Sequence, residues 1–419
     1  MKMNYAHNPI LDNHIFIPDV EAHAWGDGRI YLYGSFDHQG IPTYCSDVYH
    51  VYSSEDMIHW TDHGQSFSLA DTDWAKDCAA LYAPDCAYKD GWYYLYYCVP
   101  DGRCGVAKSQ SPTGPFEDVG PIAGVWGIDP AVLVDDDGQA YIYWGQLTWG
   151  KAAKLKDNMV EIDPDTVTDM LTVEEHEFHE GSSVKKINGK YYFLFADTHR
   201  HGNRPTSLGY AVSDTPLGKY EYKGVIVDNF GCDPKVWNNH GSMECFGGQW
   251  YVFYHRSTYG GVNSRHVCIE PIYFDVDGNI MEAVQTTSGV GDPIPAKNHF
   301  PANLACELTG HVRIAGDESS PENLVLTEVR DGDTATYRYL LFDGETCLRI
   351  RMKNGASCPA DCRVELYLDG MYHAEAKVAL TDTYTETEMA MPAVGGDRAV
   401  TLKFYGDFTD ASVESFTFA

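Results

Sequence analysis

Basic residues are scarce in this chain of 419 residues, which has 30 Lys and Arg against 61 Asp and Glu and a formal net charge of −31 at pH 7. Nucleic acids and anionic membrane surfaces are bound by clustered Lys and Arg, so we expect neither as a partner. No apolar run approaches the roughly 20 residues of a membrane-spanning helix. The first residues also contain no apolar run suitable for a signal peptide. This predicts a cytoplasmic protein, or a secreted one if a signal was trimmed from the sequence.

Helix signals and closely spaced cysteines are also rare. Residues 173–177 are at most one helical turn. Cys358 and Cys362 form the tightest pair among the twelve cysteines, but no second pair and no His pair lies nearby at the spacing of a zinc site. In the absence of a secretion signal, we expect the cysteines to be reduced, mostly buried structural thiols.

Aromatic residues and glycine turns are abundant, and together they favour an all-β protein. The segment 179–195 is the clearest example. Asn188-Gly189 is typical of a type I′ hairpin turn, because both central residues of that turn need positive φ. The aromatic and apolar residues 191–195 predict the second strand, and Glu180 lies near the start of the first.

This pattern of a polar residue, a strand, a glycine turn and an aromatic strand occurs five times. The turn glycines are Gly28, Gly91, Gly138, Gly189 and Gly248, which are 63, 47, 51 and 59 residues apart. The polar residues are Asp19, Asp85, Asp129, Glu180 and His240. Repeats of several short strands with this period are the signature of a β-propeller with about four strands per blade. We therefore predict a five-bladed β-propeller in residues 1–296.

The rest of the chain has a different pattern. Residues 289–296 are rich in Gly and Pro and predict a linker. Residues 297–419 contain alternating strands separated by Asp-Gly and Asn-Gly turns, which predict a β-sandwich of jelly-roll type. This region has no tryptophan, so a structural role is as reasonable as sugar binding; Tyr367 and Tyr372 are its candidates for stacking on a sugar.

In a propeller the first strand of each blade lines the central channel, so the five polar residues should converge at one mouth of it. Each of them alone could be an ordinary hydrogen-bonded loop residue. Carboxylates packed together without a neighbouring cation raise one another's pKa, however, and such clusters are typical of acid–base sites. The pattern thus favours an acid–base site at the channel mouth.

The five blade starts carry a resemblance to a known family. The segments 17–19, 83–85, 127–130, 179–181 and 239–242 resemble the blade-start motifs of glycoside hydrolase family 43, whose members include β-xylosidases, α-L-arabinofuranosidases and arabinanases. The resemblance covers about residues 1–296 and implies a five-bladed propeller. It implies that Asp19 is the general base, Glu180 the general acid and Asp129 the residue that orients and tunes the acid. Family members often have Asp-Pro-Ser at blade 1, whereas this chain has Asp19-Val20-Glu21, so Glu21 is a rival to Asp19.

The resemblance implies further site residues. Arg265 resembles an arginine that binds sugar hydroxyls, with a surface arginine as the alternative. His240 lies where family members often have a histidine near a calcium or other cation, although a structural histidine is the alternative. No organic cofactor is expected. We predict substrate contacts for three more residues, namely Asp85, Phe16 and Trp74. The C-terminal region resembles carbohydrate-binding family 6 modules.

These features predict an inverting exo-glycosidase that removes pentosyl units from oligosaccharides. We favour an α-L-arabinofuranosidase acting on arabinoxylan or arabinan fragments, with a β-xylosidase or a bifunctional enzyme as the alternative. A non-catalytic sugar-binding propeller and a retaining fructan-acting propeller enzyme stay open as alternatives. The sequence leaves the oligomeric state open.

Overall fold

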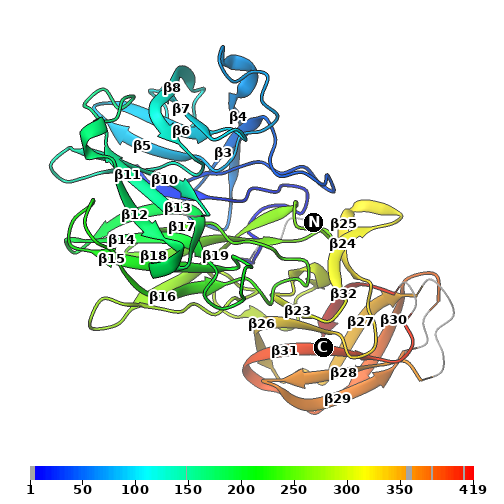
Figure 1. Ribbon diagram of the computed structural model, residues 1–419. Coiled ribbons are helices and arrows are strands. Elements are labelled where there is room, and N and C mark those ends of the chain that lie inside the picture. The colour runs from blue at the N-terminus through cyan, green and yellow to red at the C-terminus, as the bar shows by residue number, and fades with distance from the viewer. Residues whose placement is uncertain (1–4, 148, 355–360, 379–380, 409–410) are drawn as a thin grey trace.

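The computed structural model describes residues 5–147, 149–354, 361–378, 381–408 and 411–419. They form a propeller followed by a sandwich of two sheets, which lies at the lower right of Figure 1 in yellow to red. Helix is limited, within these ranges, to α1 (Val173–His176) and the 3₁₀ turns η1 (Leu69–Asp71), η2 (Pro164–Thr166) and η3 (Ala302–Leu304). None of these helices is long and apolar enough to cross a membrane.

Five four-stranded antiparallel sheets form the blades, each built from consecutive strands. Blade 1 contains β1 (Glu21–Ala24), β2 (Ile30–Tyr33), β3 (Val48–Ser54) and β4 (Thr61–Ser68). Blade 2 contains β5 (Asp85–Lys89), β6 (Trp92–Cys98), β7 (Arg103–Ser109) and β8 (Glu117–Trp126). Blade 3 contains β9 (Ala131–Val134), β10 (Ala140–Gln146), β11 (Trp149–Lys154) and β12 (Thr168–Thr172). Blade 4 contains β13 (Phe178–Ile187), β14 (Lys190–Asp197), β15 (Ser207–Ser213) and β16 (Glu221–Asp228). Blade 5 contains β17 (Ser242–Phe246), β18 (Gln249–Ser257), β19 (Arg265–Phe274) and β20 (Ile280–Met281).

The first strands of the blades surround the central channel. β1, β5, β9, β13 and β17 contact one another in this order, and β17 contacts β1 again. The ring is reinforced at its closure by the N-terminal segment, because the Asn8 side-chain amide donates to the Ile269 carbonyl at 3.0 Å and the Asn8 backbone N–H donates to the Thr287 carbonyl at 2.8 Å. The predicted polar residues therefore lie at or near the starts of the channel-lining strands.

Blade 4 shows how the local sequence produces this arrangement. Asn188 and Gly189 have φ of +51° and +80°, as the predicted type I′ turn requires, and residues 191–195 are all buried. The strand before the turn is not regular. Its pairing with β14 shifts between Glu180 and Ser183, where Gly181 has a φ of +80°. This bulge changes the direction of the backbone at the position of Glu180, so that the start of β13 turns toward the channel mouth.

The remaining strands form two six-stranded sheets. The first contains β21 (Ile294–Pro295), β23 (Glu307–Thr309), β26 (Thr334–Asp343), β28 (Arg363–Leu368), β29 (Met371–Lys377) and β31 (Gly395–Tyr405). The second contains β22 (Phe300–Pro301), β24 (Arg313–Asp317), β25 (Ser320–Thr327), β27 (Cys347–Lys353), β30 (Thr385–Ala390) and β32 (Ser412–Phe418). Alternate residues of β27, namely Leu348, Ile350 and Met352, are fully buried in one core shared by both sheets. This alternation is what a sandwich strand with one buried face requires.

The propeller and the sandwich share buried polar contacts. The Arg256 guanidinium, 1% exposed, donates to the carbonyls of Ala305 at 2.9 Å and Asn8 at 3.1 Å. The Leu308 N–H donates to the Gly231 carbonyl at 2.7 Å. Since a buried guanidinium is costly unless its donors are paired, these hydrogen bonds of Arg256 and Leu308 hold the two parts in a fixed arrangement.

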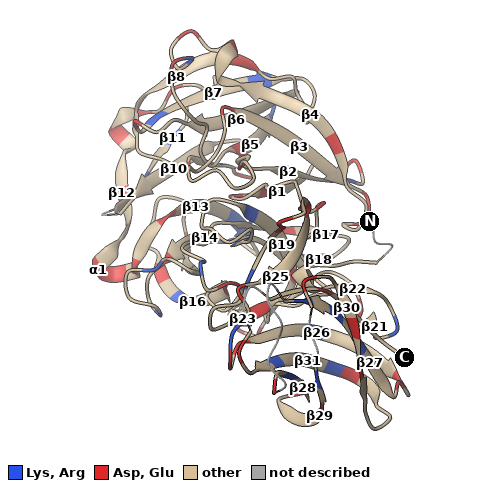
Figure 2. Ribbon diagram, turned by 90° about the vertical axis from the view of Figure 1, so that its right-hand side faces the viewer, with Lys and Arg blue, Asp and Glu red and all other residues tan. Residues whose placement is uncertain are grey.

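Charged residues are spread over both parts of the molecule (Figure 2).

The cysteines differ in one respect from the sequence-based expectation. Ten cysteines of the described ranges are free thiols, and most are buried. Cys362, however, is disulfide-bonded, so the prediction of a reduced thiol is wrong for this residue. Cys358, the other member of the tightest pair, lies outside the described residues.

Candidate active site

A cavity of about 210 Å³ opens at the channel mouth and is lined by residues near the starts of the blades. Asp19, Asp129, Glu180 and His240 all contribute to its wall, together with Arg265. Its other lining residues are Tyr44, Cys45, Tyr82, Ala83, Ile128, Gln146, His179, Trp237 and Asn238. The structure therefore brings together five of the eight residues predicted from the sequence.

Asp19 is a buried carboxylate held by a cation. It is 5% exposed, its Oδ1 accepts from Arg265 Nη1 at 2.8 Å, and its Oδ2 accepts from Ser35 Oγ at 2.8 Å. Burial acts to raise the pKa of Asp19, but the Arg265 guanidinium outweighs it and holds that pKa well below its ordinary value. Asp19 is thus ionised at neutral pH, the state that a general base requires.

Asp129 and Glu180 form a coupled pair of carboxyl groups on the adjacent wall. Asp129 is 5% exposed, and its Oδ2 accepts from the Gly181 N–H at 3.0 Å, directly after Glu180 in the chain. Burial, followed by the nearby Glu180 carboxylate, raises the pKa of Asp129 well above its ordinary value. The cavity thus has a carboxylate with a lowered pKa, Asp19, on one side and a carboxyl group with a raised pKa, Asp129, on the other.

Arg265 lines the cavity, but its main partners lie inside the protein. It is 2% exposed, and its Nε and Nη2 donate to the two oxygens of Asp37 at 2.8 and 3.0 Å. The Asp37 side chain is fully buried and also accepts from the Cys45 N–H at 3.0 Å. Asp37 therefore fixes the guanidinium in the orientation that presents Nη1 to Asp19. A sugar contact by Arg265 stays a prediction.

Three predicted substrate contacts lie elsewhere. Phe16 is completely buried and packs against the His266 ring, with ring centroids 4.2 Å apart. Trp74 packs against Tyr97 in blade 2. Asp85 is 2% exposed and joins blades, since its Oδ1 pairs with His23 Nε2 at 2.8 Å and its Oδ2 accepts from the Val132 N–H at 2.6 Å. None of the three lines the cavity. Aromatic and carboxylate side chains near a blade start can also pack between blades, so position in the repeat alone does not identify a substrate contact.

His240 lies between the two walls of the cavity. Its Nδ1 is 3.9 Å from Asp19 Oδ1 and 3.9 Å from Asp129 Oδ2. Burial lowers the pKa of His240 although the neighbouring Asp19 and Glu180 act to raise it, so the ring is neutral at neutral pH. The three groups do not form a compact ligand set. Within the described ranges, the one group of three with ligand atoms all inside 4.8 Å is Glu21, His23 and Asp85.

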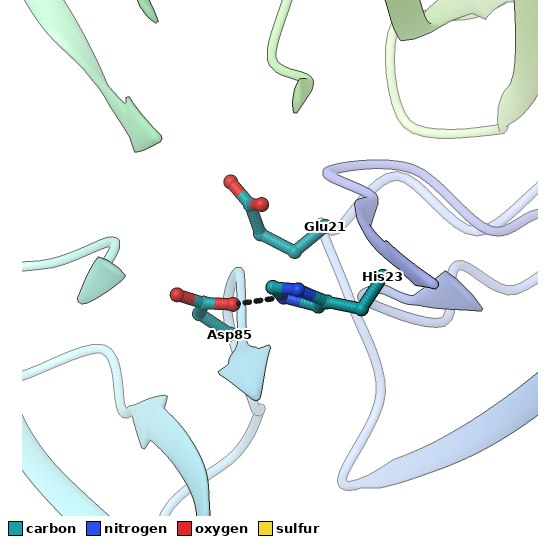
Figure 3. Close-up of side chains that lie close together, drawn as sticks. All are labelled: Glu21, His23 and Asp85. Carbon is teal, nitrogen blue, oxygen red and sulfur yellow. Dashed lines mark hydrogen bonds and ion pairs between the residues drawn. The ribbon is translucent and has the colours of Figure 1, made fainter. Parts of the chain in front are cut away.

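This second group comes from β1 and β5 (Figure 3). Glu21 is 3% exposed, and its Oε1 has no hydrogen-bond partner. Burial, with Lys185 as the next cause, lowers the pKa of His23 and keeps its imidazole neutral. Two carboxylates and a neutral imidazole suit a divalent cation, so these residues fit one. Lys185 lies alongside, where its Nζ donates to Glu244 Oε2 at 2.9 Å and contacts His23 Nδ1 at 3.4 Å.

Glu21 was the sequence-level rival of Asp19 as the base. Strand alternation would point both side chains the same way, but Asp19 has a φ of +56° and lies before β1, which begins at Glu21. Asp19 lines the cavity, whereas Glu21 does not and instead lies with His23 and Asp85. The geometry therefore favours Asp19 as the residue that can meet a ligand in the cavity.

Sequence reasoning missed several residues of the site. Gln146 and Asn238 both donate to the Glu180 carboxylate, at 2.8 and 3.2 Å. Trp237, 41% exposed, is the most exposed aromatic residue of the cavity wall. A signal was present for two of them, because Trp237-Asn238 comes just before His240, at a predicted blade start. No pattern in the sequence pointed to Asp37, which lies far along the chain from Arg265.

Comparison with known proteins identifies the family of this chain. The family model of Glycosyl hydrolases family 43 matches residues 6–280. The chain belongs to this family. It is 29% identical to a xylosidase/arabinosidase of Thermoclostridium stercorarium, over 98% of both chains. The crystal structure of a family 43 arabinoxylan arabinofuranohydrolase from Bacillus subtilis in complex with cellotetraose is similar over 100% of this chain and 98% of that one, with 25% identity and a TM-score of 0.59.

A second solved family 43 enzyme is a β-xylosidase/α-arabinofuranosidase from a compost microbial metagenome, in complex with xylotriose and in a calcium-free form. It is 30% identical over 68% of this chain and 98% of that one, with a TM-score of 0.58. The family 43 assignment makes this protein a glycoside hydrolase, and the matched residues 6–280 belong to the propeller. The non-catalytic sugar-binding propeller is therefore set aside.

Proposed function

We propose that this glycoside hydrolase is an inverting exo-acting enzyme that removes single pentosyl units from oligosaccharides. The observation that carries the proposal is that one cavity is lined by a carboxylate held ionised by a cation, Asp19, and on the other side by Glu180 with Asp129 beside it, whose pKa is raised. Inversion needs this division, because one carboxylate deprotonates a water and one carboxylic acid protonates the leaving oxygen. The cavity of about 210 Å³ is smaller than the roughly 300–1,000 Å³ typical of sites for drug-sized ligands, which favours one terminal sugar.

In this mechanism Asp19 removes the proton from a water as that water attacks the anomeric carbon. Glu180 gives its proton to the glycosidic oxygen as the bond to the leaving group breaks. Asp129 accepts from the Gly181 N–H, directly after Glu180, and so fixes the backbone from which the acid extends. The two reacting carboxyl groups of an inverting enzyme stand roughly 6.5–9.5 Å apart to admit the water.

For the substrate we favour α-L-arabinofuranosides, with β-D-xylosides as the second candidate. The support comes from the similar proteins, which bear the names xylosidase/arabinosidase and arabinoxylan arabinofuranohydrolase. Both pentosides are cleaved with the same pair of carboxyl groups, so the acid–base geometry does not separate them. Trp237 is the exposed aromatic ring that is best placed to contact a sugar in the cavity.

The test is hydrolysis of para-nitrophenyl α-L-arabinofuranoside and β-D-xyloside by the wild type and by Glu180→Ala and Asp19→Ala. We expect activity on at least one glycoside and a loss of about 10²–10⁴-fold in each variant. Glu221→Ala, on the outer strand β16, is the matched control and should keep full activity. Full activity of Glu180→Ala would reject the acid assignment. NMR of the first-formed sugar distinguishes inversion from the retention expected of a fructan-acting type of enzyme.

We also propose where a cation binds. The calcium or other cation expected beside His240 is better accommodated by Glu21, His23 and Asp85, whose ligand atoms are compact. One solved relative was obtained in a calcium-free form, as its description states. A divalent cation bound there would neutralise the Glu21 and Asp85 carboxylates and tie blade 1 to blade 2.

A further inference from the structure

The Glu180 carboxyl group is held by two amides. Gln146 Nε2 donates to its Oε2 at 2.8 Å, and Asn238 Nδ2 donates to its Oε1 at 3.2 Å. Four titratable groups also face this carboxyl group, namely His179, with Nε2 at 3.8 Å from Oε2, and Asp129, His240 and Tyr44, which interact with it electrostatically. Neither Lys nor Arg contacts this carboxyl group in the described part of the chain. The acid is thus held by neutral partners.

Neutral amides suit a group that must exist in two protonation states. An amide carries an acceptor oxygen and a donor nitrogen, so it can donate to a carboxylate or, after rotation, accept from a protonated carboxyl group. A Lys or Arg offers donors only and would favour the carboxylate in every state. Gln146 is exposed at the end of β10, whereas Asn238 is 7% exposed.

Asn238 is fixed by a second buried contact. Its Oδ1 lies 3.2 Å from Nε2 of His255, and Nδ1 of His255 lies 3.3 Å from the Asp19 backbone nitrogen. His255 is completely buried. Because the Asp19 N–H donates to Nδ1, the proton of this imidazole lies on Nε2 and points at Asn238 Oδ1. The Asn238 amide is thereby oriented with its nitrogen toward Glu180.

These hydrogen bonds distinguish the two amides. The Asn238 amide is held in one orientation, in which its nitrogen donates to Oε1 of Glu180. Gln146 contacts Oε2, and its amide can present either its nitrogen or its oxygen there. His255 links this arrangement to the backbone of Asp19 on the opposite wall. The orientation of the acid is thus coupled to the position of the base.

We propose that Asn238 and Gln146 are positioning residues that orient the Glu180 carboxyl group so that it donates its proton from Oε2. His255 fixes the position of Asn238 relative to Asp19. This inference rests on the proposed function. It concerns only the step in which the Glu180 proton passes to the leaving oxygen while the glycosidic bond breaks.

Leaving groups of different basicity test it. A 2,4-dinitrophenyl glycoside needs little protonation of its leaving group, whereas an alkyl glycoside or a disaccharide of the same sugar needs an acid. We expect Asn238→Ala to lower kcat/KM by roughly 10–100-fold on the alkyl glycoside and by less than about threefold on the dinitrophenyl glycoside. Gln146→Ala, at an exposed position, should show the same selectivity and keeps the test open if Asn238→Ala folds poorly.

The matched control is Asn239→Ala. Asn239 is the neighbouring buried amide, and its Nδ2 donates to the Thr206 carbonyl at 3.2 Å rather than to Glu180. We expect this variant to change kcat/KM by the same factor on both glycosides. Equal losses on both glycosides in Asn238→Ala and Gln146→Ala, or no loss, would overturn the positioning role. A wild type inactive on every pentoside would instead overturn the proposed function beneath it.

Discussion

Removal of the Arg265 guanidinium should move the acidic limb of the pH–activity profile. Arg265 Nη1 lies 2.8 Å from Asp19 Oδ1, and this contact opposes the effect of burial on the Asp19 pKa. An opposite charge at this range lowers a carboxyl pKa by about 1–3 units, equivalent to about 1.4–4 kcal/mol. In Arg265→Gln the burial of Asp19 is no longer opposed, so its pKa rises. The base then becomes protonated within the pH range of the assay.

The same change lowers stability in a pH-dependent way. Asp37 and Asp19 lose their shared cation, and breaking a buried ion pair costs about 3–5 kcal/mol. In the wild type the depressed Asp19 pKa contributes stability that is present above the unfolded pKa of about 3.9 and is lost as pH falls through the folded value. In Arg265→Gln the folded pKa is raised instead. The variant should therefore lose stability as pH rises from about 4 toward 7.

The assay is kcat/KM on a para-nitrophenyl pentoside from pH 4 to 8, with thermal midpoints across the same range. We expect the acidic limb of Arg265→Gln to move upward by at least one pH unit, and that of Arg265→Lys to move less, because Lys keeps the charge although it loses the bidentate pairing with Asp37. A profile of Arg265→Gln that is scaled down but otherwise superimposes on that of the wild type would refute the reasoning. It would mean that the guanidinium does not set the charge of Asp19.

Three further predictions follow from packing and charge. Gly241→Ala should lower the free energy of unfolding by about 1–3 kcal/mol in chemical denaturation, because the added Cβ would lie 1.8 Å from the Phe253 carbonyl oxygen. Gly261→Ala is the control and should leave the free energy of unfolding nearly unchanged, since the space around Gly261 is open. Phe416→Ala should cost about 3–5 kcal/mol in the same measurement, since its buried ring packs against other aromatic rings of the sandwich core; a cost under about 1 kcal/mol would contradict this core assignment. Calcium at about 100 times its Kd should stabilise the wild type by about 2.7 kcal/mol and raise its thermal midpoint after EDTA treatment, with no such response in Glu21→Gln; an equal response in both would place the ion elsewhere.

The fold was predictable because its signals are local. Turn glycines such as Gly91 and Gly189 have the positive φ that hairpin turns require, and the aromatic strands after them are mostly buried. The one-turn helix α1 was predicted as well. The sequence did not predict the disulfide bond of Cys362, because cysteine pairing depends on distances across the fold.

For the site, the repeat alone determined which residues stand at the blade starts. Because each blade begins at the channel, Asp19, Asp129, Glu180 and His240 could be placed at one mouth before any coordinates were known. The same repeat predicted Asp85 as a fifth member, but that side chain turns aside to join blades 1 and 3. Repeat position fixes where a backbone runs, whereas the rotation of each side chain depends on its neighbours in other blades.

The tertiary structure decided which of these groups carries charge and which keeps a proton. That depends on burial and on partners far along the chain: Arg265 beside Asp19, and Asn238 beside Glu180. Electrostatic interactions act through space at a few ångströms, and no local sequence pattern encodes those distances. The sequence by itself therefore determined the architecture and the list of carboxylates, and the closure of the propeller ring determined their chemistry.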